Sequence, residues 1–219
     1  MSDEPKQNFF KWSIAAENLV QNLTDVFLAG GDTTSNSLEW TTYYLSKHPE
    51  VLAKLQSEID KVVDQERTPY LMVRPLMVYT EAFICEVLRK SSVVPLGIFH
   101  RAVEDETING YLIPKDTTII ANIYAAHHDP QVWGDPENFR PERWIDQDGK
   151  LKKFDQLVAF SAGKRSCIGE PIARMQLWLF ITAVFQRFDV KASGKLPSPD
   201  GFGVSLAPLP FEASFTRRK

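Results

Sequence analysis

Cysteine is scarce in this chain, where only Cys85 and Cys167 occur among 219 residues. Neither belongs to a C-x-x-C pair, and two cysteines are too few for a disulfide framework or for a structural zinc site. Both classes of small, cross-linked protein are therefore excluded. A single disulfide between the two cysteines remains open.

Long hydrophobic runs are also missing. The longest nearly continuous one, residues 177–184, is too short to cross a bilayer, and the first residues lack the features of a signal peptide. The sequence therefore predicts no membrane anchor within this chain.

Charge of one sign does not dominate either. The formal net charge is −3 with both signs spread along the chain, which gives no basic surface for nucleic acid. With 43% hydrophobic and 24% charged residues, the composition is that of a globular protein. We find no internal repeat and no linker, so we expect one domain that does not bind nucleic acid.

The spacing of apolar residues predicts a mainly helical fold. Four stretches carry apolar side chains at helical intervals and are bounded by proline or by polar segments. They are residues 18–47, 49–63, 75–90 and 167–185.

Short extended segments lie between and after these helices. Residues 103–120 alternate around Asn109-Gly110, which is typical of a β-hairpin, whereas residues 129–153 are dotted with proline and are expected to be irregular. Residues 188–215 indicate strands around a turn rich in proline and glycine. The predicted fold class is mainly α with small β-sheets.

A ten-residue segment near the C-terminus combines a cysteine with features that stabilise a thiolate. The cysteine follows a glycine turn and an arginine and stands where an apolar helix begins; helix-start amides and a nearby cation both favour charged sulfur. The pattern is F-x-x-G-x-R-x-C-x-G, and its fixed positions are Phe160, Gly163, Arg165, Cys167 and Gly169.

The first predicted helix contains a second unusual string, A-G-G-D-T-T at residues 29–34. Gly30 and Gly31 should each cost roughly 1 kcal/mol relative to alanine, so they need a reason to be there. One explanation is close helix packing, and the other is a groove where a ligand approaches the backbone. In the second case the Thr33 hydroxyl could hold O₂ or water while the Asp32 carboxylate passes protons from solvent.

Glu86 and Arg89 lie three residues apart on one face of the third predicted helix. Such a pair is common and contributes only about 0.2–0.5 kcal/mol when exposed, so it proves nothing by itself. It gains meaning from its position between the acid-alcohol string and the cysteine segment, and from the later F-R-P-E-R-W string that contains Arg143 and Trp144.

These four motifs, in this order, resemble those of the cytochromes P450, and the resemblance extends over essentially the whole chain. Several segments, such as S-K-H-P-E-V at residues 46–51, are similar to eukaryotic microsomal members. The resemblance implies the C-terminal portion of a single P450 domain over residues 1–219, with the N-terminal half absent. Trp144 stands where phenylalanine is common, which keeps an aromatic side chain.

The resemblance also implies a site. Cys167 would be the axial iron ligand of haem b, His100 and Arg165 would contact the propionates, and Phe160 would pack near the sulfur. Asp32 and Thr33 would be catalytic, and Glu86, Arg89 and Arg143 would form a buried charge network that locks the cysteine segment. The implied haem-binding residues are Ala29, Gly30, Thr33, His100, Phe160, Gly163, Arg165, Cys167 and Gly169. The implied substrate pocket contains Phe27, Val93, Val94, Leu96, Ile98, Phe202 and Val204.

The implied function is that of a monooxygenase of the endoplasmic reticulum membrane. It would activate O₂ with electrons that NADPH supplies through NADPH-cytochrome P450 reductase, with cytochrome b5 as a further donor, and insert one oxygen atom into a hydrophobic substrate. One alternative is a non-catalytic haem-binding fragment or short isoform. Another is an isomerase or dehydratase on the P450 fold, against which the Asp32 and Thr33 pair argues, since such enzymes need no proton delivery to O₂.

Three further residues attract attention without indicating a site. His127 and His128 precede the irregular stretch, and we expect them to face solvent or to hydrogen bond to a loop rather than to bind a metal. Cys85 lies on the apolar side of the third predicted helix and is expected to be a small buried residue.

Overall fold

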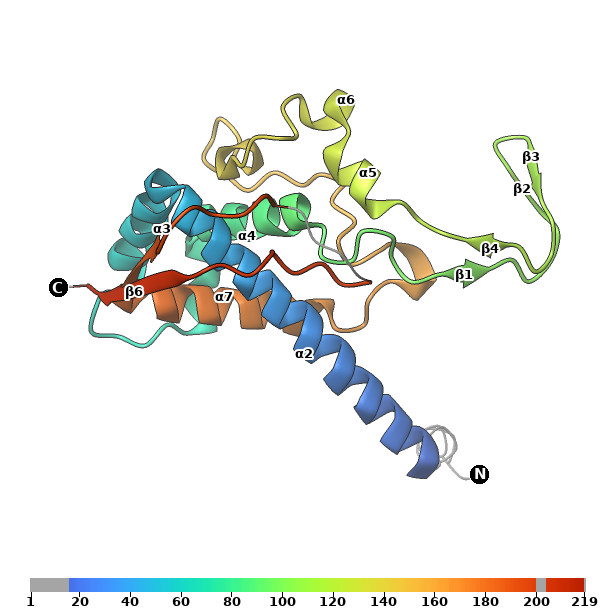
Figure 1. Ribbon diagram of the computed structural model, residues 1–219, viewed down its shortest axis with the longest axis horizontal. Coiled ribbons are helices and arrows are strands. Elements are labelled where there is room, and N and C mark those ends of the chain that lie inside the picture. The colour runs from blue at the N-terminus through green and yellow to red at the C-terminus, as the bar shows by residue number, and fades with distance from the viewer. Residues whose placement is uncertain (1–15, 200–203, 219) are drawn as a thin grey trace, which may run out of the picture.

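The longer helices pack into a body from which one helix and one β-ribbon project (Figure 1). The computed structural model describes residues 16–199 and 204–218. The four long helices are α2 (Ala16–Lys47), α3 (Pro49–Val62), α4 (Val78–Ser91) and α7 (Glu170–Arg187). Shorter turns of helix are η1 (Leu71–Leu76), α5 (Ile123–His128), α6 (Pro130–Trp133), η2 (Pro141–Trp144) and η3 (Gly163–Arg165). The predicted class, mainly helical with small sheets, is confirmed.

The described residues form three small sheets, each an antiparallel pair of strands. β1 (His100–Arg101) pairs with β4 (Thr118–Ile119), β2 (Glu106–Ile108) pairs with β3 (Tyr111–Ile113), and β5 (Phe188–Ala192) pairs with β6 (Ala213–Arg217). The predicted hairpin turn has positive φ angles at Asn109 (49°) and Gly110 (84°), as a two-residue hairpin requires.

Two of the long helices, α4 and α7, begin three residues later than the sequence predicts. Pro75 belongs to η1, and α4 begins only at Val78, because the Glu58 carboxylate of α3 accepts hydrogen bonds from the backbone N–H groups of Tyr79 and Thr80 at 2.8 and 2.7 Å. A residue 21 positions away thus caps this helix. The last long helix begins at Glu170 rather than at residue 167.

The core lies between α3, α4, α7 and the C-terminal half of α2. Trp40, Leu55, Phe83 and Trp178 are each at most 1% exposed. Cys85 is buried in a second cluster with Trp133 and Trp144, as expected, and both cysteines are free, so the disulfide that the sequence left open does not form.

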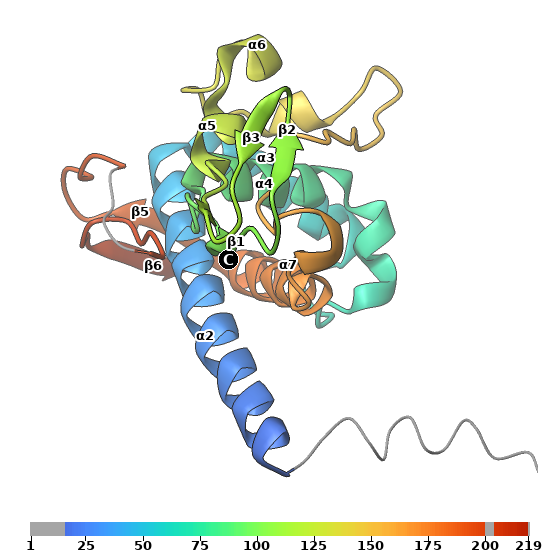
Figure 2. The same cartoon turned by 90° about the vertical axis from the view of Figure 1, so that its right-hand side faces the viewer.

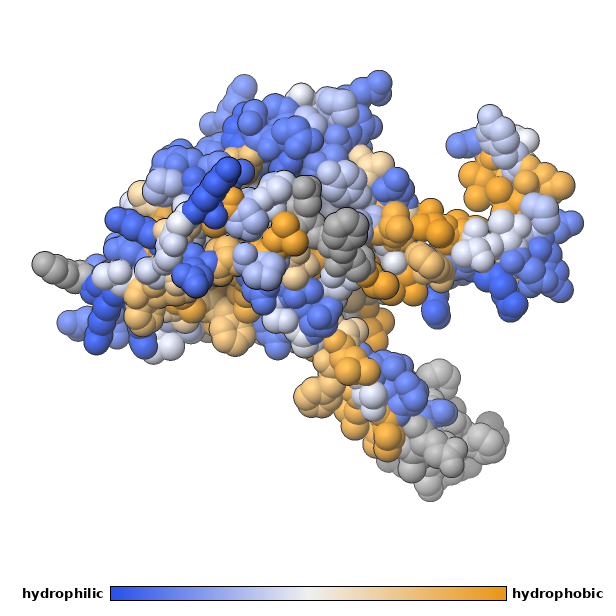
Figure 3. Space-filling model, viewed as in Figure 1, coloured by the Kyte–Doolittle hydropathy of each residue, from blue (hydrophilic) through white to orange (hydrophobic). Residues whose placement is uncertain are grey.

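The N-terminal half of α2 extends away from this core (Figure 2). Every residue from 18 to 32 is exposed, and burial begins at Asn36. The apolar residues of this half, which include Leu23 and Phe27, form an exposed hydrophobic strip (Figure 3). The predicted helix is therefore present, but only its second half is packed against the rest of the described structure.

The sequence did not predict the short helices α5, α6 and η2, of which α5 matters for the site. α5 follows Asn122, whose side chain accepts a hydrogen bond from the Ala125 N–H at 2.9 Å, and it turns His127 into the interior. His127 is 0% exposed and accepts a hydrogen bond from the Val158 N–H at 3.1 Å. The solvent-facing alternative for His127 is wrong, and the loop hydrogen bond is present.

Candidate functional site

The cysteine segment is a tight loop that ends at the start of α7. The Cys167 N–H donates to the Phe160 carbonyl oxygen at 2.9 Å, and the Ser166 N–H donates to the Gly163 carbonyl oxygen at 3.1 Å. Cys167 is exposed and free, and its sulfur would lie 3.6 Å from a Cβ atom built on Gly169. The loop therefore presents one thiol at a helix N-terminus, where backbone amides favour an anion.

Gly163 is needed for the turn itself. Its φ angle is +77°, in the left-handed region that L-residues with a Cβ atom avoid. Replacing it with alanine should lower the free energy of unfolding by roughly 1–2 kcal/mol through backbone strain alone, because no described residue beyond its chain neighbours lies within 4 Å of the new Cβ. Urea unfolding followed by circular dichroism measures the change.

Gly31→Ala is the matched control, because this glycine is helical and a Cβ there also meets nothing within 4 Å. It should raise the unfolding free energy by up to about 1 kcal/mol through helix propensity. Equal effects of the two substitutions would show that the left-handed turn at Gly163 is not needed.

Phe160 is held by a residue that the sequence analysis did not single out. The Arg174 guanidinium lies over the Phe160 ring at 5.1 Å from its centroid, and Arg174 Nε is 2.7 Å from Glu170 Oε1. Glu170 and Arg174 are four residues apart on α7, so their spacing was the available signal. The pair thus holds the aromatic ring at the first position of the cysteine segment.

Glu86, Arg89 and Arg143 meet in the interior. Glu86 and Arg89 are 0% exposed, and Arg89 donates to the two carboxylate oxygens through Nη2 and Nε at 2.8 and 2.9 Å. Arg143 Nε donates to Glu86 Oε1 at 3.1 Å, and Trp144 Nε1 donates to Oε2 at 2.9 Å. The Arg140 N–H adds a bond of 2.9 Å, so this one buried carboxylate accepts five hydrogen bonds.

Arg143 also holds the irregular stretch in place. Its guanidinium donates to the carbonyl oxygens of Trp133, Asp135 and Asn138 and to the Asp135 carboxylate. Desolvation acts to raise the pKa of Asp135, but the hydrogen bonds and charges of Arg143 and Arg140 outweigh it and bring the pKa to about 2. The Asp135 charge is therefore kept at all but very acid pH.

The acid-alcohol string lies on the projecting part of α2. The Thr33 hydroxyl donates to the Ala29 carbonyl oxygen at 2.7 Å, and the exposed Asp32 carboxylate is 3.5 Å from Asn36 Nδ2. A Cβ atom on Gly30 or Gly31 would meet no atom of the described residues within 4 Å. Close packing within the described structure therefore does not explain the glycines, and an open helix face suits an approaching ligand.

The segments that carry the predicted pocket residues converge on α2. The Leu206 N–H donates to the Val93 carbonyl oxygen at 2.7 Å, and the Leu206 carbonyl oxygen accepts from Trp40 Nε1 at 2.9 Å. Asn36 Nδ2 donates to Ser205 Oγ at 2.7 Å. The tail turn and the segment after α4 are thereby joined to the same helix.

The predicted pocket residues themselves differ in burial. Phe27, Ile98 and Val204 are more than 70% exposed, Leu96 is 43% exposed, Val94 is half-buried and Val93 is buried. Phe202 lies outside the described residues. The exposed members leave apolar surface free for a hydrophobic ligand.

The residues at Cys167 fit a haem. Within residues 16–199 and 204–218, no three His, Cys, Asp or Glu side chains are placed to hold a metal ion. Ile168 beside the thiol is 87% exposed and Ile98 is 72% exposed, which suits a flat apolar ring. His100 and Arg165 are exposed and could donate to its carboxylates.

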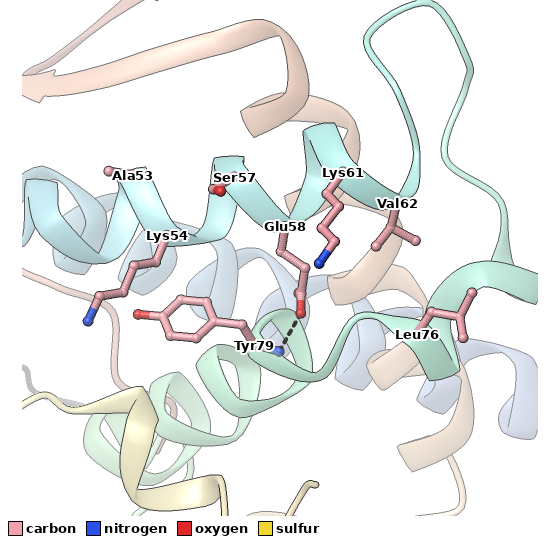
Figure 4. A pocket seen from close by; sticks show the side chains of 8 residues that line it. All are labelled: Ala53, Lys54, Ser57, Glu58, Lys61, Val62, Leu76 and Tyr79. Carbon is pink, nitrogen blue, oxygen red and sulfur yellow. Dashed lines mark hydrogen bonds between the residues drawn. The ribbon is translucent and has the colours of Figure 1, made fainter. Parts of the chain in front are cut away.

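A separate open groove of about 550 Å³ lies between α3 and the start of α4 (Figure 4). It is lined by Ala53, Lys54, Ser57, Glu58, Lys61, Val62, Leu76 and Tyr79. None of these is a predicted site residue. The Glu58 carboxylate there caps α4, and the groove is separate from the candidate haem site at Cys167.

Comparison with known proteins supports the family resemblance that the cysteine motif suggested. A profile of the family described as Cytochrome P450 matches residues 4–215. Cytochrome P450 2U1 of Homo sapiens is 41% identical over 219 residues, which cover 99% of this chain and 40% of that protein. Cytochrome P450 2C8 of Homo sapiens is 44% identical over 176 residues, which cover 80% of this chain and 36% of that protein.

A relative with a more specific name is the Steroid 17-alpha-hydroxylase/17,20 lyase of Squalus acanthias, which is 41% identical over 208 residues. The match covers 93% of this chain and 41% of that protein. The chain thus spans about two fifths of the length of these curated relatives. Among the described residues, no helix is both long and apolar enough to cross a membrane.

Proposed function

Because this chain belongs to the cytochrome P450 family, we propose that it forms the haem-thiolate site of a monooxygenase, with haem b held by Cys167. The observation that carries the proposal is the exposed, free Cys167 at the start of α7, in a loop closed by the hydrogen bond from its own N–H to Phe160. Bound haem supplies O₂ reduction and O–O cleavage, which a thiolate ligand favours, as is known for this family as a whole.

The chain's own residues would bind the haem and move protons. His100 and Arg165, which are exposed, would donate to the propionates, and the open backbone face of Ala29 and Gly30 would let the macrocycle approach α2. Thr33 would hold a proton at Oγ1, and the exposed Asp32 carboxylate would replace it from solvent. Glu86, Arg89 and Arg143 would hold the irregular stretch against the cysteine loop.

Electrons would come from NADPH through NADPH-cytochrome P450 reductase, with cytochrome b5 as a further donor, and the whole protein would work at the endoplasmic reticulum membrane. These statements rest on the microsomal relatives. The substrate would be a hydrophobic organic compound, which the exposed apolar side chains of Phe27, Ile98 and Val204 support.

Turnover with labelled oxygen tests this function. The haem-loaded protein is combined with reductase, NADPH and ¹⁸O₂ and offered a set of steroids, fatty acids and drug-like compounds. We expect one ¹⁸O atom in the product and the other in water. Haem binding without any labelled product would instead support a non-catalytic haem protein.

Thr33→Ala should uncouple NADPH consumption from product formation. In the structure the Thr33 hydroxyl donates to the Ala29 carbonyl oxygen. The substitution removes this hydroxyl and leaves the backbone hydrogen bonds of the helix in place. We expect product per NADPH to fall by roughly tenfold, less than the 10²–10⁴ of a complete acid catalyst because water can partly replace the hydroxyl. Hydrogen peroxide should rise by the matching amount.

Thr34→Ala is the control, since Thr34 is the next residue on the same helix and is equally half-buried. Its coupling should stay at the wild-type level. Unchanged coupling in Thr33→Ala would contradict the proton-delivery role.

A further inference from the structure

The buried His127 is hydrogen bonded at both ring nitrogens, and this determines its tautomer. Nε2 must be an acceptor, because its partner at 3.1 Å is the Val158 N–H, which also reaches the Gln156 carbonyl oxygen. The proton is therefore on Nδ1 and is donated to Ser92 Oγ at 2.9 Å. The Ser92 hydroxyl in turn donates to the Arg89 carbonyl oxygen at 2.9 Å.

These bonds join two parts of the candidate site. On one side, Ser92 ends α4 in a left-handed conformation, and the Arg89 guanidinium donates to the His127 carbonyl oxygen at 2.8 Å. On the other side, the Val158 carbonyl oxygen accepts from the Ser161 N–H at 2.8 Å, inside the loop that leads to Cys167. His127 thus connects the Glu86 and Arg89 pair to the loop. Its carbonyl oxygen bonds to Arg89 directly, and its ring bonds to Val158 on one side and, through Ser92, to the Arg89 carbonyl oxygen on the other.

The ring is held in its neutral form. Burial lowers the pKa of His127 to about 3, and His128 on its own helix and Arg89 of α4 act in the same direction. The segment before the loop contributes the Val158 amide to the ring. An imidazolium would carry a proton on Nε2 and could no longer accept this N–H.

We propose that His127 is a positioning residue for the haem ligand, which fixes the cysteine loop to the Glu86 and Arg89 pair by accepting the Val158 N–H and donating to Ser92. The inference rests on the proposed role of Cys167. His127 would act on the haem ligand indirectly, by holding the loop, and would contact neither haem nor substrate.

Two substitutions separate the hydrogen bonds from the shape of the ring. His127→Phe keeps a flat aromatic side chain and removes both bonds, whereas His127→Gln keeps an acceptor and a donor. His128→Phe is the matched control, because His128 is adjacent and half-buried, and its Nδ1 bonds to the Tyr124 carbonyl oxygen of its own helix.

Two measurements are made on the whole chain. They are hydrogen exchange followed by mass spectrometry and the absorption spectrum of the reduced CO complex. With His127→Phe, exchange at residues 158–167 should quicken by tenfold or more, and the fraction with a thiolate-type spectrum should fall several-fold. His127→Gln should recover more than half of both effects, and His128→Phe should match the wild type.

The exchange readout keeps this inference separate from the proposed function. If the wild type itself lacks a thiolate-type spectrum, the haem role of Cys167 fails, while the exchange at residues 158–167 still decides whether His127 holds the loop. The inference would be overturned if residues 158–167 of a folded His127→Phe protein exchanged at the wild-type rate. It would also be overturned if these residues exchanged equally fast in His127→Gln and His127→Phe.

If His127→Phe does not fold, Ser92→Gly takes its place. It removes the acceptor of the Nδ1 proton, and glycine accepts the positive φ of 42° at this position. Quickened exchange confined to residues 158–167 and to the end of α4 supports the inference, and unchanged exchange there overturns it.

Discussion

Cys167→Ala is expected to abolish both the thiolate-type spectrum of the reduced CO complex and all monooxygenase turnover. Within the described residues Cys167 is an exposed free thiol, and the other cysteine, Cys85, is buried. Alanine removes the donor atom and leaves the loop bonds of the backbone, such as that from residue 167 to Phe160, in place. Absorption spectra of the haem-loaded variant, recorded before and after reduction under CO, measure the result.

Cys85→Ala is the matched control for the thiol. Burial raises the pKa of Cys85 to about 11, so this thiol stays protonated at neutral pH and cannot serve as an anionic ligand. The variant should keep the wild-type spectrum and lose roughly 1 kcal/mol of stability from the small cavity. A thiolate-type spectrum that survives in Cys167→Ala and disappears in Cys85→Ala would overturn the assignment of the ligand.

Glu86→Gln should strongly destabilise the protein. It leaves the shape of the side chain but removes the negative charge that Arg89 and Arg143 share at 2.8 and 3.1 Å. The buried Arg89 guanidinium then faces a neutral amide, while Arg143 keeps the Asp135 carboxylate at 2.9 Å. Breaking a buried ion pair in this way costs about 3–5 kcal/mol. That is a large part of the 5–15 kcal/mol by which a domain is stable.

Urea unfolding and the yield of haem-loaded protein measure this loss. Glu81→Gln is the control, because Glu81 lies on the same helix and also binds an arginine through two bonds, to Arg74 at 2.6 and 3.0 Å, but with both side chains partly exposed. It should cost no more than about 1 kcal/mol. Similar losses for the two variants would show that the buried network is not a main source of stability.

Much of this fold could be predicted from local patterns. The first helix ends before Pro49, and α3 begins at that proline, because proline terminates one helix and suits the first turn of the next. The hairpin turn at Asn109-Gly110 is equally local, since its positive φ angles favour these two residue types. In both cases the physical cause lies within a few residues of the chain.

Other features depend on residues far apart in the sequence. The start of α4 is set by Glu58, and α5 places His127 in the interior beside Ser92, which is 35 residues earlier. The spacing of Glu86 and Arg89 predicted a pair but not a carboxylate that accepts five hydrogen bonds, because three of the donors come from residues 140–144. No local sequence pattern predicts hydrogen-bond partners that are so far apart in the chain.

The exposed thiol of the candidate site could be predicted from local sequence, because a cysteine in F-x-x-G-x-R-x-C-x-G needs only a turn and a helix start to present its sulfur. The contacts that join the surrounding segments could not, since their partners are far apart in the chain. The Glu86 network joins α4 to residues 133–144, and His127 joins the end of α4 to Val158, through hydrogen bonds in the buried interior, where an unpaired polar group is costly.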